Sequence, residues 1–190
     1  MCPTARFVLS ALFFRLLLGM SAAAGPAAEA PATTLTSGLR EALSGTWVYA
    51  GGDAEQAKVD AAVDRAVANL PPLSRKIASD SLRPRARPRA QYVLAFEGTA
   101  VRITSPDDPE ERGEVGGPPV SLTNRFGDRS QTTFRVQGGT LVEAGWNPDG
   151  SGETVFTPGE DGKTLLVHRV MRSSKLAAPV DMTLTYRRQD

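Results

Sequence analysis

The stretch "LSGTWVYAGGDAEQAKVDAAVDRAVANLPPL", residues 43–73, joins a strand pattern to the most regular helical pattern of the chain. Its first residues alternate around Trp47 like a β-strand, and Gly51-Gly52 then turns the chain. Asp53 and Gln56 have nearly the spacing of a capping box, which marks a helix start. Six apolar side chains then recur at helical spacing: Val59, Ala62, Val63, Ala66, Val67 and Leu70. The stretch therefore predicts one strand followed directly by an amphipathic helix.

A second short helix is predicted after Pro71-Pro72, because Pro72 suits the first turn of a helix that carries Leu73 and Ile77 on one side. The following "RPRARPRA", residues 83–90, is predicted to lie outside regular structure because its prolines favour extended backbone. The predicted helix-turn-helix thus spans residues 53–82. Its apolar face is mostly Ala and Val, too thin for a core of its own, so it is expected to cover another part of the fold.

Beyond residue 90 the apolar pattern changes to a period of two, typical of strands with one apolar face. Turn residues recur about every 8–12 positions and separate roughly eight to ten short strands, counting the one at Trp47. This spacing predicts a mainly β, antiparallel meander that forms either a barrel or a sandwich. An up-and-down barrel of that size leaves no open sheet edge and is about wide enough for one small ligand.

The N-terminal residues "MCPTARFVLSALFFRLLLGMSAAA", 1–24, have the pattern of a secretory signal peptide with cleavage after Ala24. Arg15 interrupts the apolar run and leaves less than the roughly 20 apolar residues of a membrane span, so an uncleaved anchor is the weaker alternative. Residues 25–36 predict a flexible leader and residues 37–190 a single domain, expected to be secreted or periplasmic.

Composition excludes several classes of function. Cys2 is the only cysteine and His168 the only histidine, so disulfides, thiol catalysis and multi-His or Cys metal sites are not expected. The chain has 22 Lys and Arg against 21 Asp and Glu, and loss of Arg6 and Arg15 with the first 24 residues leaves a net charge of −1. That balance argues against a nucleic-acid partner.

Two motifs resemble a known superfamily. "LSGTWVY", residues 43–49, resembles the Gly-x-Trp opening strand of the calycins, which include the lipocalins and the cytosolic fatty-acid-binding proteins. A helix pair directly after the first strand is similar to the fatty-acid-binding branch, in which it forms a lid over the barrel mouth. "MTLTYRR", residues 182–188, resembles that branch's closing strand. The resemblance runs from Leu43 to Arg188 and implies a lidded barrel.

The resemblance implies a non-catalytic protein that binds a small hydrophobic ligand, such as a lipid, without a cofactor. Where the family's closing strand carries a carboxylate-binding Arg, this chain has Leu184, and Arg169 is the candidate substitute if its face of the strand points inward. The opening Trp47 is expected to pack against Arg187 or Arg188 through a cation–π contact. The other predicted ligand-binding side chains are Phe96, Phe134, Trp146 and Tyr186 in the barrel, and Val63 and Val67 on the lid.

Alternatives remain open from sequence. A barrel filled by its own side chains would be a structural or protein-interaction domain, and His168 is a candidate axial ligand for a haem-binding barrel. Catalysis by a Ser-His-Asp triad has no Gly-x-Ser-x-Gly motif to support it. The basic segment either contacts an anionic membrane transiently or is a solvated loop; its basic side chains are Arg83, Arg85, Arg87 and Arg89.

Overall fold

The computed structural model describes residues 34–106 and 108–189. The predicted signal peptide, residues 1–24, and the leader up to residue 33 lie outside the described residues. Within these two ranges, no helix has both the length and the hydropathy required to cross a bilayer.

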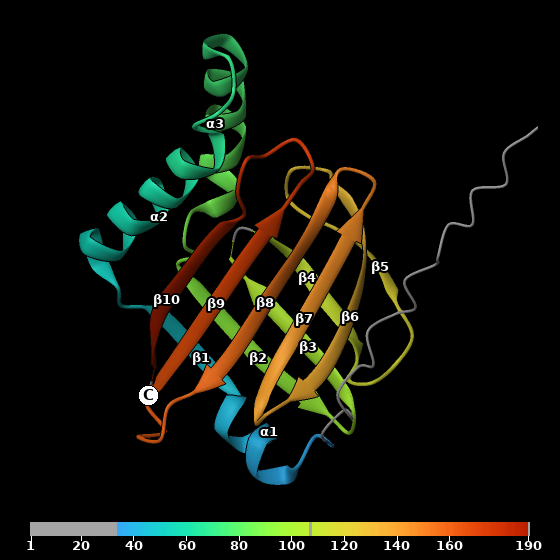
Figure 1. Ribbon diagram of the computed structural model, residues 1–190. Helices are drawn as coiled ribbons and strands as arrows, with labels where there is room; N and C mark the ends of the chain where they lie inside the picture. The colour runs from blue at the N-terminus through green and yellow to red at the C-terminus, as the bar shows by residue number, and fades with distance from the viewer. Residues whose placement is uncertain (1–33, 107, 190) are drawn as a thin grey trace, which may run out of the picture. The chain divides into compact units, whose positions relative to one another are not determined.

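Ten strands form one antiparallel sheet in which each strand pairs with its neighbour in sequence, except that β4 and β5 do not pair with each other (Figure 1). The first strand also pairs with the last, Trp47 opposite Arg188, so the meander folds round on itself. The strands are β1 (Gly45–Tyr49), β2 (Gln91–Glu97), β3 (Ala100–Ser105), β4 (Asp108–Glu114), β5 (Val120–Thr123), β6 (Arg129–Gln137), β7 (Thr140–Asn147), β8 (Gly150–Pro158), β9 (Thr164–Arg172) and β10 (Val180–Arg188).

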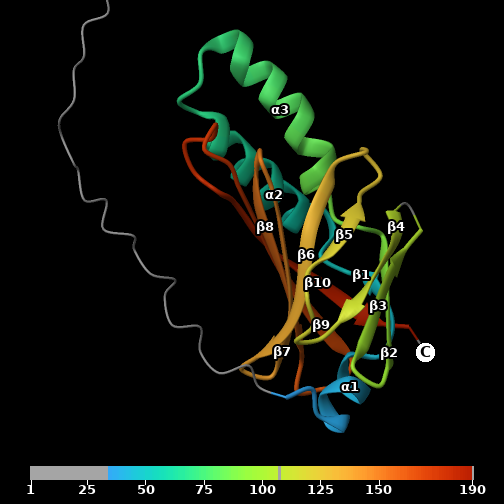
Figure 2. The same cartoon turned by 90° about the vertical axis from the view of Figure 1, so that its right-hand side faces the viewer.

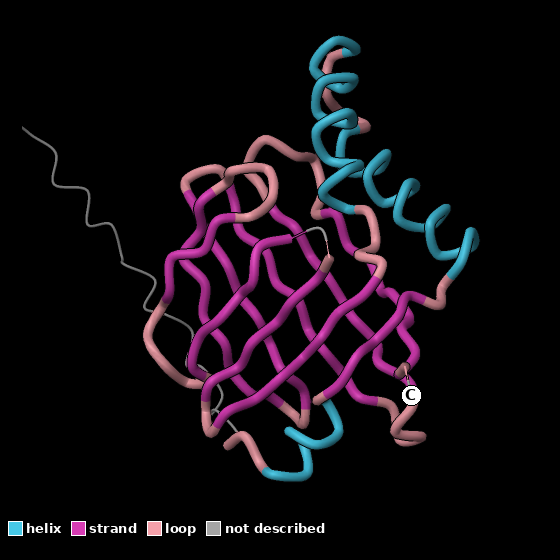
Figure 3. The backbone as a smooth tube through the Cα atoms, turned by 180° about the vertical axis from the view of Figure 1, so that it is seen from behind, coloured by secondary structure: helices cyan, strands magenta, loops and turns pink. Residues whose placement is uncertain are grey.

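The two edge strands of the sheet, β4 and β5, meet and nearly close the barrel, whose front and back strands cross in Figure 3. Val115 forms a bridge to Phe134 of β6, and the Gly116 N–H donates to the Phe134 carbonyl at 2.7 Å. Gly113 allows this approach, because a Cβ there would lie 2.6 Å from the Phe134 ring. The predicted antiparallel up-and-down barrel with helices after its first strand is confirmed.

Three helices flank the barrel. In Figures 1 and 2, α1 (Ser37–Leu43) lies at one end of the strands, whereas α2 (Gly52–Val67) and α3 (Pro72–Ala86) lie at the other. Helix α2 packs along β10 and buries one side, which includes Val63 and Val67. Glu55 of α2 anchors this packing, because it accepts hydrogen bonds from the Thr185 N–H at 2.9 Å and from the Thr185 hydroxyl at 2.6 Å.

The prediction that residues 83–90 lie outside regular structure is wrong for their first half, since α3 continues through Pro84 to Ala86. Interior proline removes one helical N–H donor, but ion pairs on both sides hold this last turn in place. Arg83 reaches α2, with its Nη1 2.8 Å from Asp60 and its Nη2 2.6 Å from Asp64. Periodicity alone cannot reveal such pairs, because their acidic partners lie about 20 residues away.

Large aromatic side chains fill much of the barrel interior. Tyr92 packs edge-to-face on Tyr186 and on Phe156, with ring centroids 5.1 and 5.4 Å apart. Trp47 and Phe134 are also buried. Each such aromatic pair contributes roughly 0.5–1.5 kcal/mol beyond the area it buries. The interior is therefore a packed core over much of its volume, and space for a ligand has to be sought near the helices.

Candidate ligand-binding site

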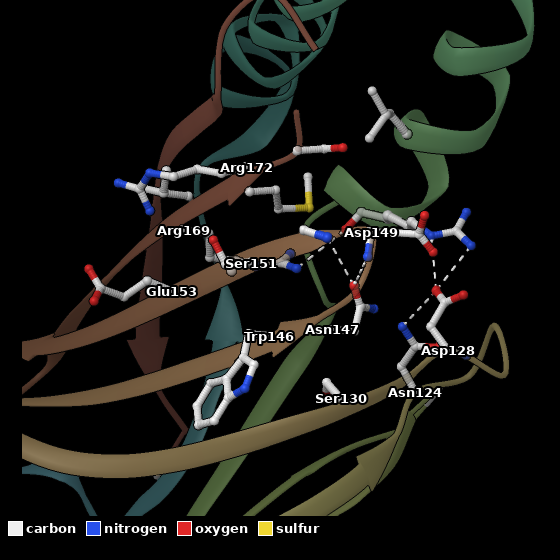
Figure 4. Close-up of a pocket in the computed structure, with 18 of the residues that line it drawn as sticks. Asn124, Asp128, Ser130, Trp146, Asn147, Asp149, Ser151, Glu153, Arg169 and Arg172 are labelled. Atoms are coloured by element: carbon white, nitrogen blue, oxygen red, sulfur yellow. Dashed lines mark hydrogen bonds and ion pairs between the residues drawn. The ribbon is translucent and has the colours of Figure 1, made fainter. Parts of the chain in front are cut away.

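A cavity of about 550 Å³ lies where α3 meets the ends of β6 to β9. Figure 4 shows its lining beneath the end of α3, with Asn124 and Asp128 on the side of that helix. The volume is within the range of small-molecule sites, roughly 300–1,000 Å³. Apolar lining comes from Leu82 of α3, Met171 of β9 and Leu176. The rest is largely polar, so the cavity suits a molecule with both characters.

Three inward-facing side chains form a row across neighbouring strands. Glu143 of β7 pairs in register with Thr154 of β8, which pairs with Arg169 of β9. All three line the cavity. Adjacent strands lie about 4.8 Å apart, so the backbone positions of Glu143 and Arg169 are each about 5 Å from that of Thr154 and about 10 Å from each other along the cavity wall.

The register settles which side of β9 faces inward. Leu165 and Val167 are buried, whereas Leu166 is exposed, so the inward series ends in Arg169 and Met171. The Arg169 Nη2 donates to the Arg85 carbonyl at 3.3 Å, near the end of α3. Among the described residues, no carboxylate forms an ion pair with Arg169. Its positive charge therefore faces the cavity without a matched acid.

A second arginine close to the site, Arg89, is paired with two acidic side chains. Arg89, whose side chain is only 15% exposed, donates through Nε to Asp108 and through Nη2 to Glu111, both at 2.8 Å. The Tyr186 hydroxyl donates to the Arg89 carbonyl at 3.0 Å, which ties β10 to the same cluster. Sequence reasoning missed Asp108 and Glu111, because "DPEERGE" has no apolar alternation and was not predicted as a strand.

Glu143 is the acid of the row, and its side chain is partly buried. Its burial, followed by the negative charge of Glu111, raises the pKa of Glu143 from 4.5 to about 8, although Arg89 and Arg169 oppose the shift. Glu143 is therefore mostly a neutral acid at neutral pH. Of this strand, only Trp146 was predicted from sequence to line the barrel, whereas the register places Glu143, in the opposite phase, on the inward face.

A loop between β5 and β6 holds the end of α3 over the cavity. Asp128 accepts hydrogen bonds from Arg85 Nη2 and from the Asn124 side chain, both at 3.1 Å. The Asn124 hydrogen bond and then Arg85 lower the pKa of Asp128 despite partial burial. Arg125 donates to the Pro84 carbonyl at 3.1 Å. The ring of Phe126 lies under both guanidinium groups, 4.5 Å from Arg85 and 4.9 Å from Arg125.

The predicted ligand-binding residues fall into two groups. Arg169 lines the cavity from the inward phase of β9, whereas Trp146 contributes to the lining from the outward phase of β7, with a side chain that is 43% exposed. The remaining five belong to the core or pack against it, and their contact with a ligand stays a prediction; they are Phe96, Phe134, Tyr186, Val63 and Val67.

His168 faces outward, in the phase opposite to Arg169, and its Nε2 lies 2.9 Å from Asp181. An axial haem ligand inside the barrel would need the inward phase of β9. Within the described ranges, no three His, Cys, Asp or Glu side chains are grouped so that they could hold a metal ion.

The four arginines proposed for membrane contact have different surroundings. Arg83 and Arg85 form ion pairs with Asp60 and Asp128, and Arg89 is buried beside Asp108. Arg87 is exposed at the end of α3. Three of the four arginines therefore already have an acidic partner within the protein.

No protein-family model matches the chain, and no curated protein is similar to it in sequence. Solved structures are similar in fold. Apo lipid binding protein 8 of Caenorhabditis elegans has 9% sequence identity and a TM-score of 0.51, with 78% of this chain and 96% of that chain covered.

Two further structures are more distant. Zebrafish ileal bile acid-binding protein, complexed with cholic acid, has 12% identity, a TM-score of 0.48 and coverage of 78% and 99%. The Schistosoma mansoni fatty acid binding protein in complex with arachidonic acid has 9% identity, a TM-score of 0.48 and coverage of 80% and 98%. At these identities the likeness shows the fold alone.

Proposed function

We propose that this chain, a calycin-type barrel of the fatty-acid-binding-protein-like form, binds one small amphipathic molecule and catalyses no reaction. The observation that carries the proposal is the cavity of about 550 Å³ beneath α3, whose lining combines polar groups with the apolar side chains of Leu82, Met171 and Leu176. The lipid-binding name of the Caenorhabditis elegans structure supports a ligand of this class.

The ligand's apolar part would lie against Leu82, Met171 and Leu176. These side chains are only partly buried by the protein itself, so a ligand can cover the remainder. Apolar burial contributes about 25 cal/mol per Å² before the costs of binding are subtracted. The polar end would face the row of Glu143, Thr154 and Arg169.

A second candidate function is a structural or protein-interaction domain. The aromatic cluster around Tyr92 favours it, because much of the interior is filled by the protein's own side chains. The two candidates differ in what the cavity does: it either holds a ligand or stays open to water.

We also propose that the protein is exported, to the periplasm or outside the cell. Support comes from the sequence pattern of residues 1–24. Fusion of residues 1–30 to a reporter that is active only after export tests this independently of ligand binding.

Native mass spectrometry of the purified protein, before and after organic extraction, tests ligand binding directly. A discrete added mass that disappears on extraction is expected. Leu82→Trp on the cavity side of α3 should weaken binding by about tenfold by filling the site. Leu73→Trp is the matched control, because Leu73 is on the same helix but 74% exposed. An unmodified mass that stays unchanged after incubation with fatty acids, bile acids and haem would favour the structural domain.

A further inference from the structure

Two arginines of β9, Arg169 and Arg172, line the cavity without an ion pair among the described residues. Arg172 is exposed and lies in the outward phase of the strand, so Arg169 is the unpaired cation of the inward face. Arg89 is neutralised by Asp108 and Glu111, and Arg125 lies 3.6 Å from the other oxygen of Asp108. Glu143 is the remaining acid on the wall, in the same cross-strand row as Arg169. The charge state of Glu143 therefore decides whether the cavity wall is positive or neutral near Arg169.

Geometry around Glu111 favours the neutral form of Glu143. Oε1 of Glu111 accepts from Arg89, whereas Oε2 is buried and receives no donor from the described residues. The charge of Glu111 and a side-chain hydrogen bond with it both raise the pKa of Glu143, and only a protonated carboxyl can donate to a carboxylate. A proton on Glu143 thus satisfies a buried acceptor that would otherwise cost about 1–3 kcal/mol.

Charged groups on the other elements around the cavity are already paired. Arg85 of α3 is held by Asp128 of the β5–β6 loop, and Lys175 of the β9–β10 loop by Asp149. These pairs are roughly neutral and leave the cation of the strand wall unchanged. An anion that enters the cavity therefore meets Arg169 as its partner.

Building on the proposed function, we propose that Arg169 holds an anionic head group of the ligand while Glu143 is a neutral acid, so that ligand binding is coupled to uptake of a proton. The Thr154 hydroxyl stands between the two side chains and can donate to the same head group. Carboxylate on guanidinium is the charge-assisted pairing that such a site favours. Glu143 is then a specificity-determining residue, because its ionised form would neutralise Arg169 and repel the anion.

The coupling has a definite sign. At alkaline pH, Glu143 loses its proton and competes with the ligand for Arg169, so affinity for an anion falls. Linkage requires the reverse effect as well: a bound anion makes Glu143 harder to ionise. A ligand without charge lacks this dependence, because neither form of Glu143 repels it.

Calorimetric titration with dodecanoate and 1-dodecanol, at about pH 6 and about pH 9.5, tests the inference. Dodecanoate is ionised at both pH values, so only the protein titrates. We expect its affinity to fall by about tenfold at the higher pH, while that of dodecanol stays constant. Titrations near pH 9 in two buffers of different ionisation enthalpy should show uptake of up to about one proton per dodecanoate bound.

The variant Glu143→Gln keeps the shape and a donor but cannot ionise, so it should flatten the pH profile and abolish proton uptake. Glu97→Gln, an exposed acid at the end of β2, is the matched control and should keep the wild-type profile. Thermal unfolding of both variants checks that they are folded.

The outcomes separate this inference from the proposed function. If neither dodecanoate nor dodecanol binds, the ligand-binding function itself fails. If both bind with equal affinity, or if dodecanoate affinity is independent of pH or rises with it, the function stands and the role of Glu143 is overturned. A pH profile that persists in Glu143→Gln also overturns it.

Discussion

The guanidinium carbon of Arg188 lies 4.4 Å from the centroid of the Trp47 ring, which is the contact between the first and last strands that the sequence predicted in outline. Arg188 also donates to the Ser44 and Ala42 carbonyls at 2.7 Å, and the Trp47 indole donates to the Leu43 carbonyl at 2.9 Å. Cations next to the C-terminal carbonyls of a helix are favourable. One side chain thus fastens α1, β1 and β10 together.

Replacing Arg188 with Met should therefore lower the free energy of unfolding by about 2–4 kcal/mol, because three charged hydrogen bonds to carbonyls and the ring contact are lost together. Urea denaturation, followed by Trp fluorescence, measures the change. Arg187→Met is the matched control: its guanidinium faces outward toward Asp161 and Thr164, and its loss should change stability by less than about 1 kcal/mol. Equal effects of the two variants would contradict this account.

Glu55→Ala should loosen α2 from the barrel, since both carboxylate oxygens bond to Thr185. We expect a loss of about 1–3 kcal/mol and faster amide exchange along α2. Asp53→Ala removes an acid from the same helical turn and serves as the control for the helix dipole. Unchanged amide exchange in Glu55→Ala would show that apolar packing alone holds the helix.

Gly113→Ala tests the closure between β4 and β6. The added methyl group would lie 2.6 Å from two carbons of the Phe134 ring, so the ring or the strand has to move. Overpacking of this kind costs about 1–3 kcal/mol. By contrast, Gly38→Ala lies in α1 with open space around the new methyl and should be neutral or slightly stabilising. Thermal unfolding compares the two, and a Gly113→Ala protein as stable as Gly38→Ala would refute the tight contact.

Stability should depend on pH through Glu143. Its pKa is about 8 in the folded protein and near 4.5 when exposed, so between these values the folded state binds more protons than the unfolded state. The contribution of Glu143 to stability therefore falls as pH rises from about 4.5 to about 8 and then levels off. Above that window Glu143→Gln should be more stable than the wild type by about 1–3 kcal/mol. Urea denaturation over this pH range measures it, and a constant difference between the two proteins would contradict the raised pKa.

Asp128→Asn should weaken the attachment of the β5–β6 loop to α3. The ion pair with Arg85 is partly exposed, so the loss of global stability should be only about 0.5–1 kcal/mol. Amide exchange at the end of α3 should nevertheless accelerate, because that turn is held by this loop. Asp80→Asn breaks an exposed pair with Lys76 on the same helix and should leave exchange at that end unchanged. If both variants leave it unchanged, the loop is not what holds the helix.

Sequence patterns predicted the barrel well because most strands bury one apolar face. The alternation at Tyr92 and Leu94, or at Met182 and Leu184, corresponds to buried positions in the structure. The alternation of apolar residues does not predict β4, because its inward positions are Glu111 and Gly113. Glu111 forms an ion pair with Arg89, and Gly113 lies against the ring of Phe134. Polar residues face inward where a buried partner exists, and a partner distant in sequence leaves no periodic signal.

The candidate site was harder to predict than the fold. Arg169 was proposed from its phase on the strand, but Glu143, Thr154 and the Arg85–Asp128 pair were missed. Their importance depends on the cross-strand register and on the extra turn of α3, neither of which a single sequence determines. The family-like motifs drew attention to Tyr186 instead, which is occupied by its hydrogen bond to the Arg89 carbonyl.

The pairing of β1 with β10 also constrains the order of folding. The hairpins within β2–β4 and within β5–β10 join strands that are neighbours in sequence and can form as soon as both are available. β1 is separated from β2 by two helices, and Trp47 opposite Arg188 spans most of the chain, so this pairing carries the largest loop-closure entropy. The first strand to be synthesised therefore waits for the last, and the barrel closes only when the chain is complete.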